Sequence, residues 1–257
     1  MTKKSTSSVN QTNWFRQSFR EDYLWLYAHR SDREAARQVK TALRFLPFKA
    51  GQKLLDIACG AGRHMLAFAQ SGAVVTGIDL SPPLLRLARE KLDKAGCRAV
   101  FKRLDMRKLD YEARFDGATM WFTSFGYFPT MADDQRVLSG LSAALKPGGW
   151  WWLDLPHPAF LENNLVPRSE STRRGPNGAA KVTETRIIRG RRVIKTIEIV
   201  DPAGKRVYKE FVRLYRPERM GQMVHRAGLS TDGILGDYDG SALSGSSPRQ
   251  IWFGRKV

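Results

Sequence analysis

The chain has 257 residues and is strongly basic, with 43 Lys and Arg against 25 Asp and Glu and a formal net charge of +18. Its length is sufficient for one large domain or for a domain with an added lobe. No uninterrupted apolar run reaches the roughly 18 residues that span a membrane, and two cysteines provide no disulfide framework. These features exclude a membrane span and a disulfide-rich secreted domain, and they favour a cytoplasmic protein.

Two segments precede the first strand pattern. Residues 1–13 are polar and lack the apolar core of a signal peptide, so we expect a disordered tail. Residues 14–30 are rich in aromatic side chains, and the spacing of four apolar residues predicts one helical stripe. The members of this stripe are Phe15, Phe19, Tyr23 and Leu26. Residues 31–34 form a capping box, which predicts a second helix to about residue 46.

Residues 54–64 read Leu-Leu-Asp-Ile-Ala-Cys-Gly-Ala-Gly-Arg-His. An apolar run ends in a loop of small residues and continues into a helix-like pattern, which is typical of the first unit of an open α/β sheet with a ligand site at the strand's carboxyl end. Gly60 and Gly62 lack a Cβ atom, so a ligand can approach their backbone closely. The free N–H groups at the start of the next helix favour a negatively charged group.

A second apolar run, residues 73–78, ends in Asp79, nineteen residues after Gly60. A carboxylate at this position can accept hydrogen bonds from two ribose hydroxyls. The dinucleotide fingerprint requires glycine or alanine where this chain has Met65. A ligand with a ribose but no pyrophosphate therefore fits better than a nicotinamide dinucleotide.

Residues 56–62, Asp-Ile-Ala-Cys-Gly-Ala-Gly, and residues 75–81, Val-Thr-Gly-Ile-Asp-Leu-Ser, resemble the first two motifs of class I S-adenosylmethionine (SAM) methyltransferases. The chain departs from the family pattern at Ala58, where the family has glycine. The resemblance covers about residues 23–257 and implies SAM as the cofactor. It implies an α/β fold with a doubly wound, mostly parallel seven-stranded sheet and an antiparallel last strand, together with an N-terminal helical lid and a small antiparallel β insertion.

The resemblance also implies which positions bind the cofactor. In the family, an acidic residue after the third strand accepts the adenine amino group, and Asp105 matches it here; a loop cap is the alternative. The predicted cofactor-binding residues are Asp56, Ala58, Cys59, Gly60, Gly62, Asp79, Leu80, Leu104, Asp105, Met106 and Trp121.

The remaining core pattern alternates between helices and strands, as a doubly wound sheet requires. Helices are predicted at residues 82–95, 132–145 and 216–227, and strands at residues 98–104, 115–121 and 150–155. Residues 146–149, Lys-Pro-Gly-Gly, should stop a helix and reverse the chain. A final hairpin should pair residues 229–238 with residues 249–257 and complete the sheet.

Three side chains are predicted on the acceptor side. In the resembling enzymes a segment before the first motif often closes over the cofactor, so Tyr23 or Tyr27 would place a hydroxyl near the substrate; packing on the sheet is the alternative. Tyr127 follows the fourth strand, where the methyl group should point, and His157 follows the fifth. A structural role is the alternative for both. The predicted catalytic residues are Tyr127, His157 and Tyr23.

Residues 166–219 contain 15 Lys or Arg against 6 Asp or Glu, which is half of the net charge in about a fifth of the chain. Alternation over residues 181–214 predicts a three-stranded antiparallel meander with one solvated face, on which Arg186, Lys195 and Lys209 point outward. In the glycine N-methyltransferase-like branch of the resembling family, such an insertion helps to enclose the substrate.

We divide the chain into five segments on these patterns. They are a disordered tail (1–13), a helical lid (14–50), a SAM-binding Rossmann-like core (51–165), an inserted antiparallel β lobe (166–215) and a C-terminal completion of the core (216–257).

The resemblance is strongest to small-molecule methyltransferases that act on glycine or amino sugars. We therefore expect in-line methyl transfer to a small-molecule acceptor. No side chain stands out as a base, which favours an amine nitrogen over a hydroxyl. Scattered histidines and cysteines indicate no metal site. The alternatives are an RNA or DNA methyltransferase that uses the basic lobe, and a non-catalytic SAM-binding protein. We expect no specific nucleic-acid binding, no membrane contact, and a monomer or homodimer.

Overall fold

The computed structural model of the protein describes residues 13–19 and 21–257. The predicted disordered tail therefore lies outside the described residues, apart from Asn13. Among the described residues, no helix is long and apolar enough to cross a membrane.

The core is a seven-stranded sheet with the strand order β10-β11-β5-β4-β1-β2-β3. Strand β1 pairs in parallel with β2 and β4, whereas β11 runs antiparallel to β5 and to β10. The strands are β1 (Lys53–Ile57), β2 (Val74–Asp79), β3 (Ala99–Arg103), β4 (Phe115–Met120), β5 (Leu145–Pro156), β10 (Gly233–Leu235) and β11 (Arg249–Arg255). The predicted fold class, including the antiparallel last strand, is confirmed.

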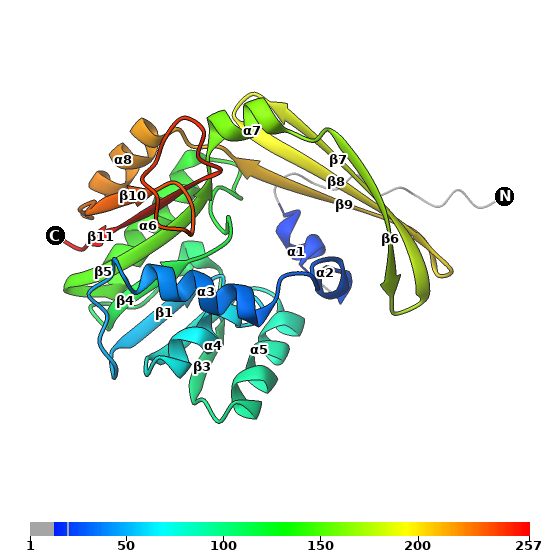
Figure 1. Cartoon of the computed structure of the whole chain (residues 1–257). Coiled ribbons are helices and arrows are strands. Elements are labelled where there is room, and N and C mark those ends of the chain that lie inside the picture. The colour runs from blue at the N-terminus through cyan, green and yellow to red at the C-terminus, as the bar shows by residue number, and fades with distance from the viewer. Residues whose placement is uncertain (1–12, 20) are drawn as a thin grey trace.

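Helices cover both faces of this sheet (Figure 1), because successive strand residues point to opposite faces. Trp150 and Trp152 pack on one face and Trp151 on the other, and all three side chains are buried. The helices on the first face are α3 (Asp32–Ala42), α4 (Arg63–Gln70) and α5 (Pro82–Lys94). The helices on the second face are α6 (Met131–Ala144) and α8 (Pro217–Arg226).

A separate antiparallel sheet follows the short helix α7 (Pro158–Asn164) and arches away from the core (Figure 1). Its strands are β6 (Arg168–Gly175), β7 (Gly178–Arg189), β8 (Arg192–Asp201) and β9 (Gly204–Arg213). The prediction of three strands was wrong, because β6 pairs with β7 along its whole length. This edge strand reads Arg-Ser-Glu-Ser-Thr-Arg-Arg-Gly and has no apolar residue to reveal the alternation.

The aromatic N-terminal segment forms two short helices, α1 (Phe15–Ser18) and α2 (Glu21–Leu26), which lie between the two sheets (Figure 1). The predicted continuous stripe is interrupted at Phe19, whose φ of −97° and ψ of 55° are not helical. Tertiary hydrogen bonds explain the break. The Phe19 carbonyl accepts from Ser81 Oγ at 2.6 Å, and Ser18 Oγ donates to the Lys209 carbonyl at 3.0 Å. These hydrogen bonds, made where the helix is interrupted, connect the segment to both sheets.

Two further boundaries differ from the prediction. Residues 146–149 form the irregular start of β5, with a register shift against β4 between Phe115 and Gly117, and do not form a separate turn. The final hairpin is shorter than expected, because β10 has only three residues. Isolated bonds continue the pairing before it, such as Ser230 N to the Arg255 carbonyl at 2.7 Å.

Candidate functional site

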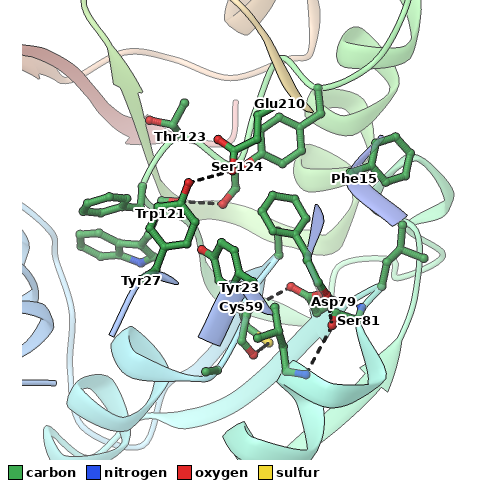
Figure 2. Close-up of a pocket in the computed structure, with 18 of the residues that line it drawn as sticks. Phe15, Tyr23, Tyr27, Cys59, Asp79, Ser81, Trp121, Thr123, Ser124 and Glu210 are labelled. Carbon is green, nitrogen blue, oxygen red and sulfur yellow. Dashed lines mark hydrogen bonds between the residues drawn. The ribbon is translucent and has the colours of Figure 1, made fainter. Parts of the chain in front are cut away.

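A cavity of about 1070 Å³ lies between the carboxyl edge of the core sheet, helices α1 and α2, and the second sheet. Figure 2 shows Cys59 and Asp79 at one end of this cavity and Glu210 at the other, with Tyr23 between them. Pockets for one drug-sized ligand have volumes of about 300–1,000 Å³. The cavity therefore has room for a cofactor and a second small molecule.

The loop between β1 and α4 forms one wall of this cavity. Ala58 and Gly62 both have positive φ, at 58° and 74°. A Cβ atom on Gly62 would lie 2.9 Å from the Ala88 Cβ atom of α5, so close helix packing requires glycine there. At Ala58 the left-handed conformation costs roughly 1–2 kcal/mol, a cost that the family's glycine avoids.

Asp79 ends β2 beside this loop. Its carboxylate accepts hydrogen bonds from the backbone N–H groups of Gly60 at 2.9 Å and Ser81 at 2.8 Å. Burial raises the pKa of Asp79, and these backbone donors oppose the shift. An ionised carboxylate offers about four acceptor positions. The backbone donors use only part of this capacity, so the carboxylate can also accept from the hydroxyls of a ribose, and the site fits SAM at this point.

Asp56 lies almost fully buried at the end of β1 and lines the same cavity. Thr119 Oγ1 donates to its carboxylate at 3.0 Å. Burial raises the pKa of Asp56 to about 7, and the charge of Asp79 adds to the shift. The two carboxylates therefore differ in how strongly their surroundings favour ionisation, because only Asp79 has backbone N–H donors that favour its ionised form.

Leu80, Leu104 and Met106 also line the cavity, and they follow the ends of β2 and β3, where the prediction placed the adenine ring. Asp105 is not among the lining residues. Its carboxylate accepts from the Arg107 backbone N–H and Nε at 3.0 Å each and from Nη2 at 2.6 Å. Burial alone would raise the pKa of Asp105, but the hydrogen bonds and charge of Arg107 lower it. The alternative of a loop cap describes this geometry, and adenine contact stays a prediction.

The segment after β4 is strained and tightly held. Phe122 and Thr123 have φ of 55° and 68°, which non-glycine residues rarely adopt. The buried carboxylate of Asp154 accepts from the Phe122 N–H at 2.7 Å and also from Tyr238 and Arg249. Arg249 Nη2 in turn donates to Thr123 Oγ1 at 3.1 Å. Such strain persists only where the surroundings enforce it, and it is common at functional sites.

Trp121, the residue before this strained pair, lines the cavity. Its indole lies between His64, stacked at 4.3 Å between ring centroids, and Tyr238, stacked at 6.1 Å. The stacking fixes the ring at the end of β4, where the prediction placed a cofactor contact.

The three predicted catalytic residues are not all brought together. Tyr23 and Tyr127 line the cavity, and the Tyr23 hydroxyl accepts from Arg30 Nη1 at 3.0 Å. Tyr127 packs between Phe19 and Trp14, and its hydroxyl makes no hydrogen bond to another described residue. His157 lies outside the cavity lining, contrary to the prediction. It is buried, with Nδ1 2.9 Å from the Ser247 carbonyl.

Sequence reasoning missed the charged side chains that the second sheet contributes to the cavity. We call this end of the cavity, around Glu210, the acceptor end. Arg186 and Lys195 were expected to point outward, but they line the cavity, because Glu184 pairs with both. Lys195 Nζ lies 2.9 Å from the Glu184 carboxylate. Lys209 lies on the opposite face from its neighbour Glu210, which lines the cavity. No local pattern separates inward from outward charges in such strands.

Arg30 was also missed. Its guanidinium lies over the rings of Tyr27 at 4.0 Å and Phe122 at 4.2 Å. Its Nε is buried without a hydrogen-bond partner, and none of the ion pairs among the described residues includes Arg30. Its guanidinium therefore lies at the cavity wall without an acidic partner among the described residues. Within residues 13–19 and 21–257, no group of three His, Cys, Asp or Glu residues could hold a metal ion.

Residues 54–149 match the family described as "Methyltransferase domain". The chain is 28% identical over 202 residues to the cypemycin N-terminal methyltransferase of a Streptomyces species, covering 78% of this chain and 82% of that protein. It is 25% identical to the dTDP-4-amino-2,3,4,6-tetradeoxy-D-glucose N,N-dimethyltransferase of Saccharopolyspora spinosa, covering 82% and 83% of the two chains.

The fold is similar to that of a SAM-bound amino pentose methyltransferase from Micromonospora echinaspora, with a TM-score of 0.67 at 24% identity over 92% of this chain and 96% of that one. Four observations point to the same fold and cofactor. They are the glycine loop, the acidic end of β2, the strand order and the family match. The chain therefore contains a methyltransferase domain at residues 54–149 and has the fold of a SAM-dependent methyltransferase.

Proposed function

We propose that this enzyme transfers the methyl group of SAM to the nitrogen of a small-molecule amine. The observation that carries the proposal is the two-ended cavity, in which the cofactor motifs face a second compartment made by α2 and the second sheet. The relatives named above are an N-terminal methyltransferase and an amino-sugar N,N-dimethyltransferase, and both names specify nitrogen as the acceptor. We place the enzyme in the cytoplasm, because its two cysteines are free.

SAM, when bound, supplies an electrophilic methyl group on a sulfonium. In our proposal Asp79 accepts hydrogen bonds from the ribose hydroxyls, and Leu80, Leu104 and Met106 contact the adenine. Arg30 holds the carboxylate of the methionine part, because its planar guanidinium lines the cavity and forms no ion pair with a described residue. Each role keeps the reacting groups close and in line, which is where most of the rate enhancement of a displacement arises.

We propose that α1 and α2 act as a lid over the bound cofactor. Both helices contribute side chains to the cavity wall, including Trp14, Phe15 and Tyr23. Side-chain contacts tie α2 to the second sheet, since Asp22 accepts from Arg206 Nε and from the Tyr208 hydroxyl at 2.7 Å each. In this proposal the layer moves as ligands enter and leave, and bound ligand should slow its hydrogen exchange.

The charges of the second sheet do not favour a nucleic-acid substrate. Many of its basic side chains already have acidic partners within the chain. These pairs include Arg168–Glu170, Lys181–Glu170, Lys205–Glu198 and Arg206–Asp201. Internal pairing reduces the charge available for phosphates, and a cavity between two sheets and two helices suits a small acceptor better than a polymer. We therefore propose no nucleic-acid partner.

A matched-pair screen tests the proposed acceptor class. The enzyme is incubated with methyl-labelled SAM and with amines and alcohols of the same carbon skeleton, together with phenols and RNA. Label should transfer to amines and not to the matching alcohols. Transfer confined to RNA, or to oxygen acceptors, would contradict the proposal.

A further inference from the structure

Glu210 is a carboxylate of the acceptor end that forms no ion pair with any described residue. It lies on β9 and lines the cavity, and Figure 2 shows it across the cavity from Cys59 and Asp79. Its Oε1 accepts a hydrogen bond from the Tyr27 hydroxyl at 2.8 Å. None of the ion pairs among the described residues includes Glu210.

The cation nearest to it in the sheet is already engaged elsewhere. Lys195 is the cross-strand neighbour of Glu210 in the β8–β9 register. Its Nζ instead contacts Glu184 at 2.9 Å and donates to the Tyr27 hydroxyl at 2.8 Å. The described residues thus supply a carboxylate that Tyr27 orients and that no cation among them contacts directly. A carboxylate in such a cavity is stabilised when a cationic ligand arrives.

The aromatic side chains around this carboxylate also suit a cation. Tyr23 and Tyr27 lie 4.6 Å apart between ring centroids, and Phe19 lies 5.0 Å from Tyr23 and 5.8 Å from Tyr127. Burial raises the pKa of the three tyrosines, and the charge of Glu210 raises each of them further. The faces of aromatic rings attract cations within about 6 Å. The tyrosines are therefore neutral hydroxyls at physiological pH.

We propose that Glu210 is the residue that binds the acceptor's amino group, with Tyr27 as a positioning residue, and that the acceptor is a primary or secondary alkyl amine that enters as an ammonium ion. The inference rests on the proposed amine methylation and names the group that recognises the nitrogen. A neutral alcohol of the same shape would leave the charge of Glu210 uncompensated, which explains selection of nitrogen over oxygen.

The same contact assists the reaction. After one ammonium proton has left to solvent, the remaining N–H groups donate to Glu210, so the nitrogen lone pair is free on the other side. That lone pair forms the new N–C bond while the C–S bond breaks and sulfur keeps the electron pair. Positive charge then develops on the nitrogen beside a fixed carboxylate, which stabilises the transition state more than the neutral amine.

Ligand binding tests this site without any knowledge of the substrate. Trimethylammonium chloride is the probe and tert-butanol its uncharged counterpart, both measured by saturation-transfer NMR on the protein loaded with S-adenosylhomocysteine. The variants are Glu210→Gln and the matched control Glu198→Gln, whose carboxylate pairs with Lys205 outside the cavity. The wild type and Glu198→Gln should bind the cation equally, and Glu210→Gln at least tenfold more weakly. Equal binding by all three proteins would overturn the proposal.

Kinetics then separate recognition from folding. With an amine found in the screen, Glu210→Gln should raise the KM for the amine and lower kcat at least tenfold, while calorimetry shows unchanged affinity for S-adenosylhomocysteine. Tyr27→Phe should cause a smaller change in the same direction. Unchanged kinetics in Glu210→Gln would contradict the assignment. If no amine is methylated, the proposed function fails, and the binding experiment still decides whether Glu210 holds a cation.

Discussion

The two ends of the cavity are built in different ways. The cofactor end consists mainly of backbone, since the loop after β1 and the N–H groups around Asp79 shape it. The acceptor end consists of Tyr27, which directly follows α2, and of side chains from β7, β8 and β9, and these residues hold one another by hydrogen bonds. The first end is encoded in a few consecutive residues. The second depends on contacts such as Tyr27 with Glu210, which are 183 positions apart.

This difference suggests that cofactor binding and acceptor recognition, as proposed above, depend on separate parts of the structure. A ligand common to many enzymes is bound by a backbone geometry that tolerates little change. A ligand particular to this enzyme is bound by side chains on an added sheet, where substitutions alter charge and shape without disturbing the core. Variants at one end should therefore leave the other end unchanged. The predictions below test this independence.

The largest effect is expected at Asp154, whose carboxylate holds Phe122 and Arg249, two residues of the cavity wall. Asp154→Ala would leave the Arg249 guanidinium buried without its partner and the Phe122 N–H without an acceptor. Removing one partner of a buried ion pair costs about 3–5 kcal/mol. Chemical denaturation should show a loss of this size, and both cofactor and trimethylammonium binding should weaken.

Asp110→Ala provides the control, because its pair with Lys102 is exposed and should contribute little. If Asp154→Ala proves too unstable to purify, Asp154→Asn keeps an acceptor for Phe122 and removes only the charge. Stability equal to that of the wild type in either variant would contradict the role of Asp154 in holding the strained turn.

The second effect concerns Asp56 and pH. Burial raises the pKa of Asp56 to about 7 in the folded protein, above the value near 3.8 of the unfolded chain. Its contribution to stability is therefore fully present below pH 3.8 and is lost as the pH rises through about 7. Asp56→Asn removes this loss, so the wild type should lose about 3 kcal/mol more than the variant between pH 5 and pH 8.

Urea unfolding at several pH values between 5 and 8 measures this difference. Asp134, whose pKa burial raises to about 6, contributes a slope of the same sign in both proteins and cancels in the comparison. Parallel curves for the wild type and Asp56→Asn would show that Asp56 ionises normally in the folded state.

The same contrast determines how much could be predicted from the sequence. The run of residues 54–64 and the position of Asp79 predict the fold and the cofactor, because strand, loop and helix follow one another locally. The inward orientation of Lys195 could not be predicted, because its burial depends on Glu184 from a neighbouring strand. His157 was assigned to the site from its place after β5, but the loop that contains Ser247 buries it elsewhere. Long-range pairing carries no local signal.

Asp79→Ala tests the cofactor end alone. Loss of the carboxylate removes the acceptors for two ribose hydroxyls and should weaken SAM binding at least tenfold, which corresponds to about 1.4 kcal/mol. Calorimetry measures the affinity, with Glu210→Gln as the comparison that should bind SAM as the wild type does. Unchanged affinity in a folded Asp79→Ala protein would contradict the ribose assignment, and weakened affinity in Glu210→Gln would contradict the independence of the two ends.

The smallest effect is expected in the glycine loop itself. Ala58 has a φ of 58°, so Ala58→Gly should relieve roughly 1–2 kcal/mol of backbone strain. The greater freedom of glycine in the unfolded chain offsets about 0.4–1 kcal/mol of this gain. The net result should be a stabilisation of about 0.5–1 kcal/mol in thermal or urea unfolding, with SAM affinity unchanged because the backbone N–H groups stay in place. Ala61→Gly, in the same loop at a position without positive φ, should instead destabilise the protein. A loss of stability in both variants would show that Ala58 is not strained and that the loop accepts alanine at the family's glycine position without cost.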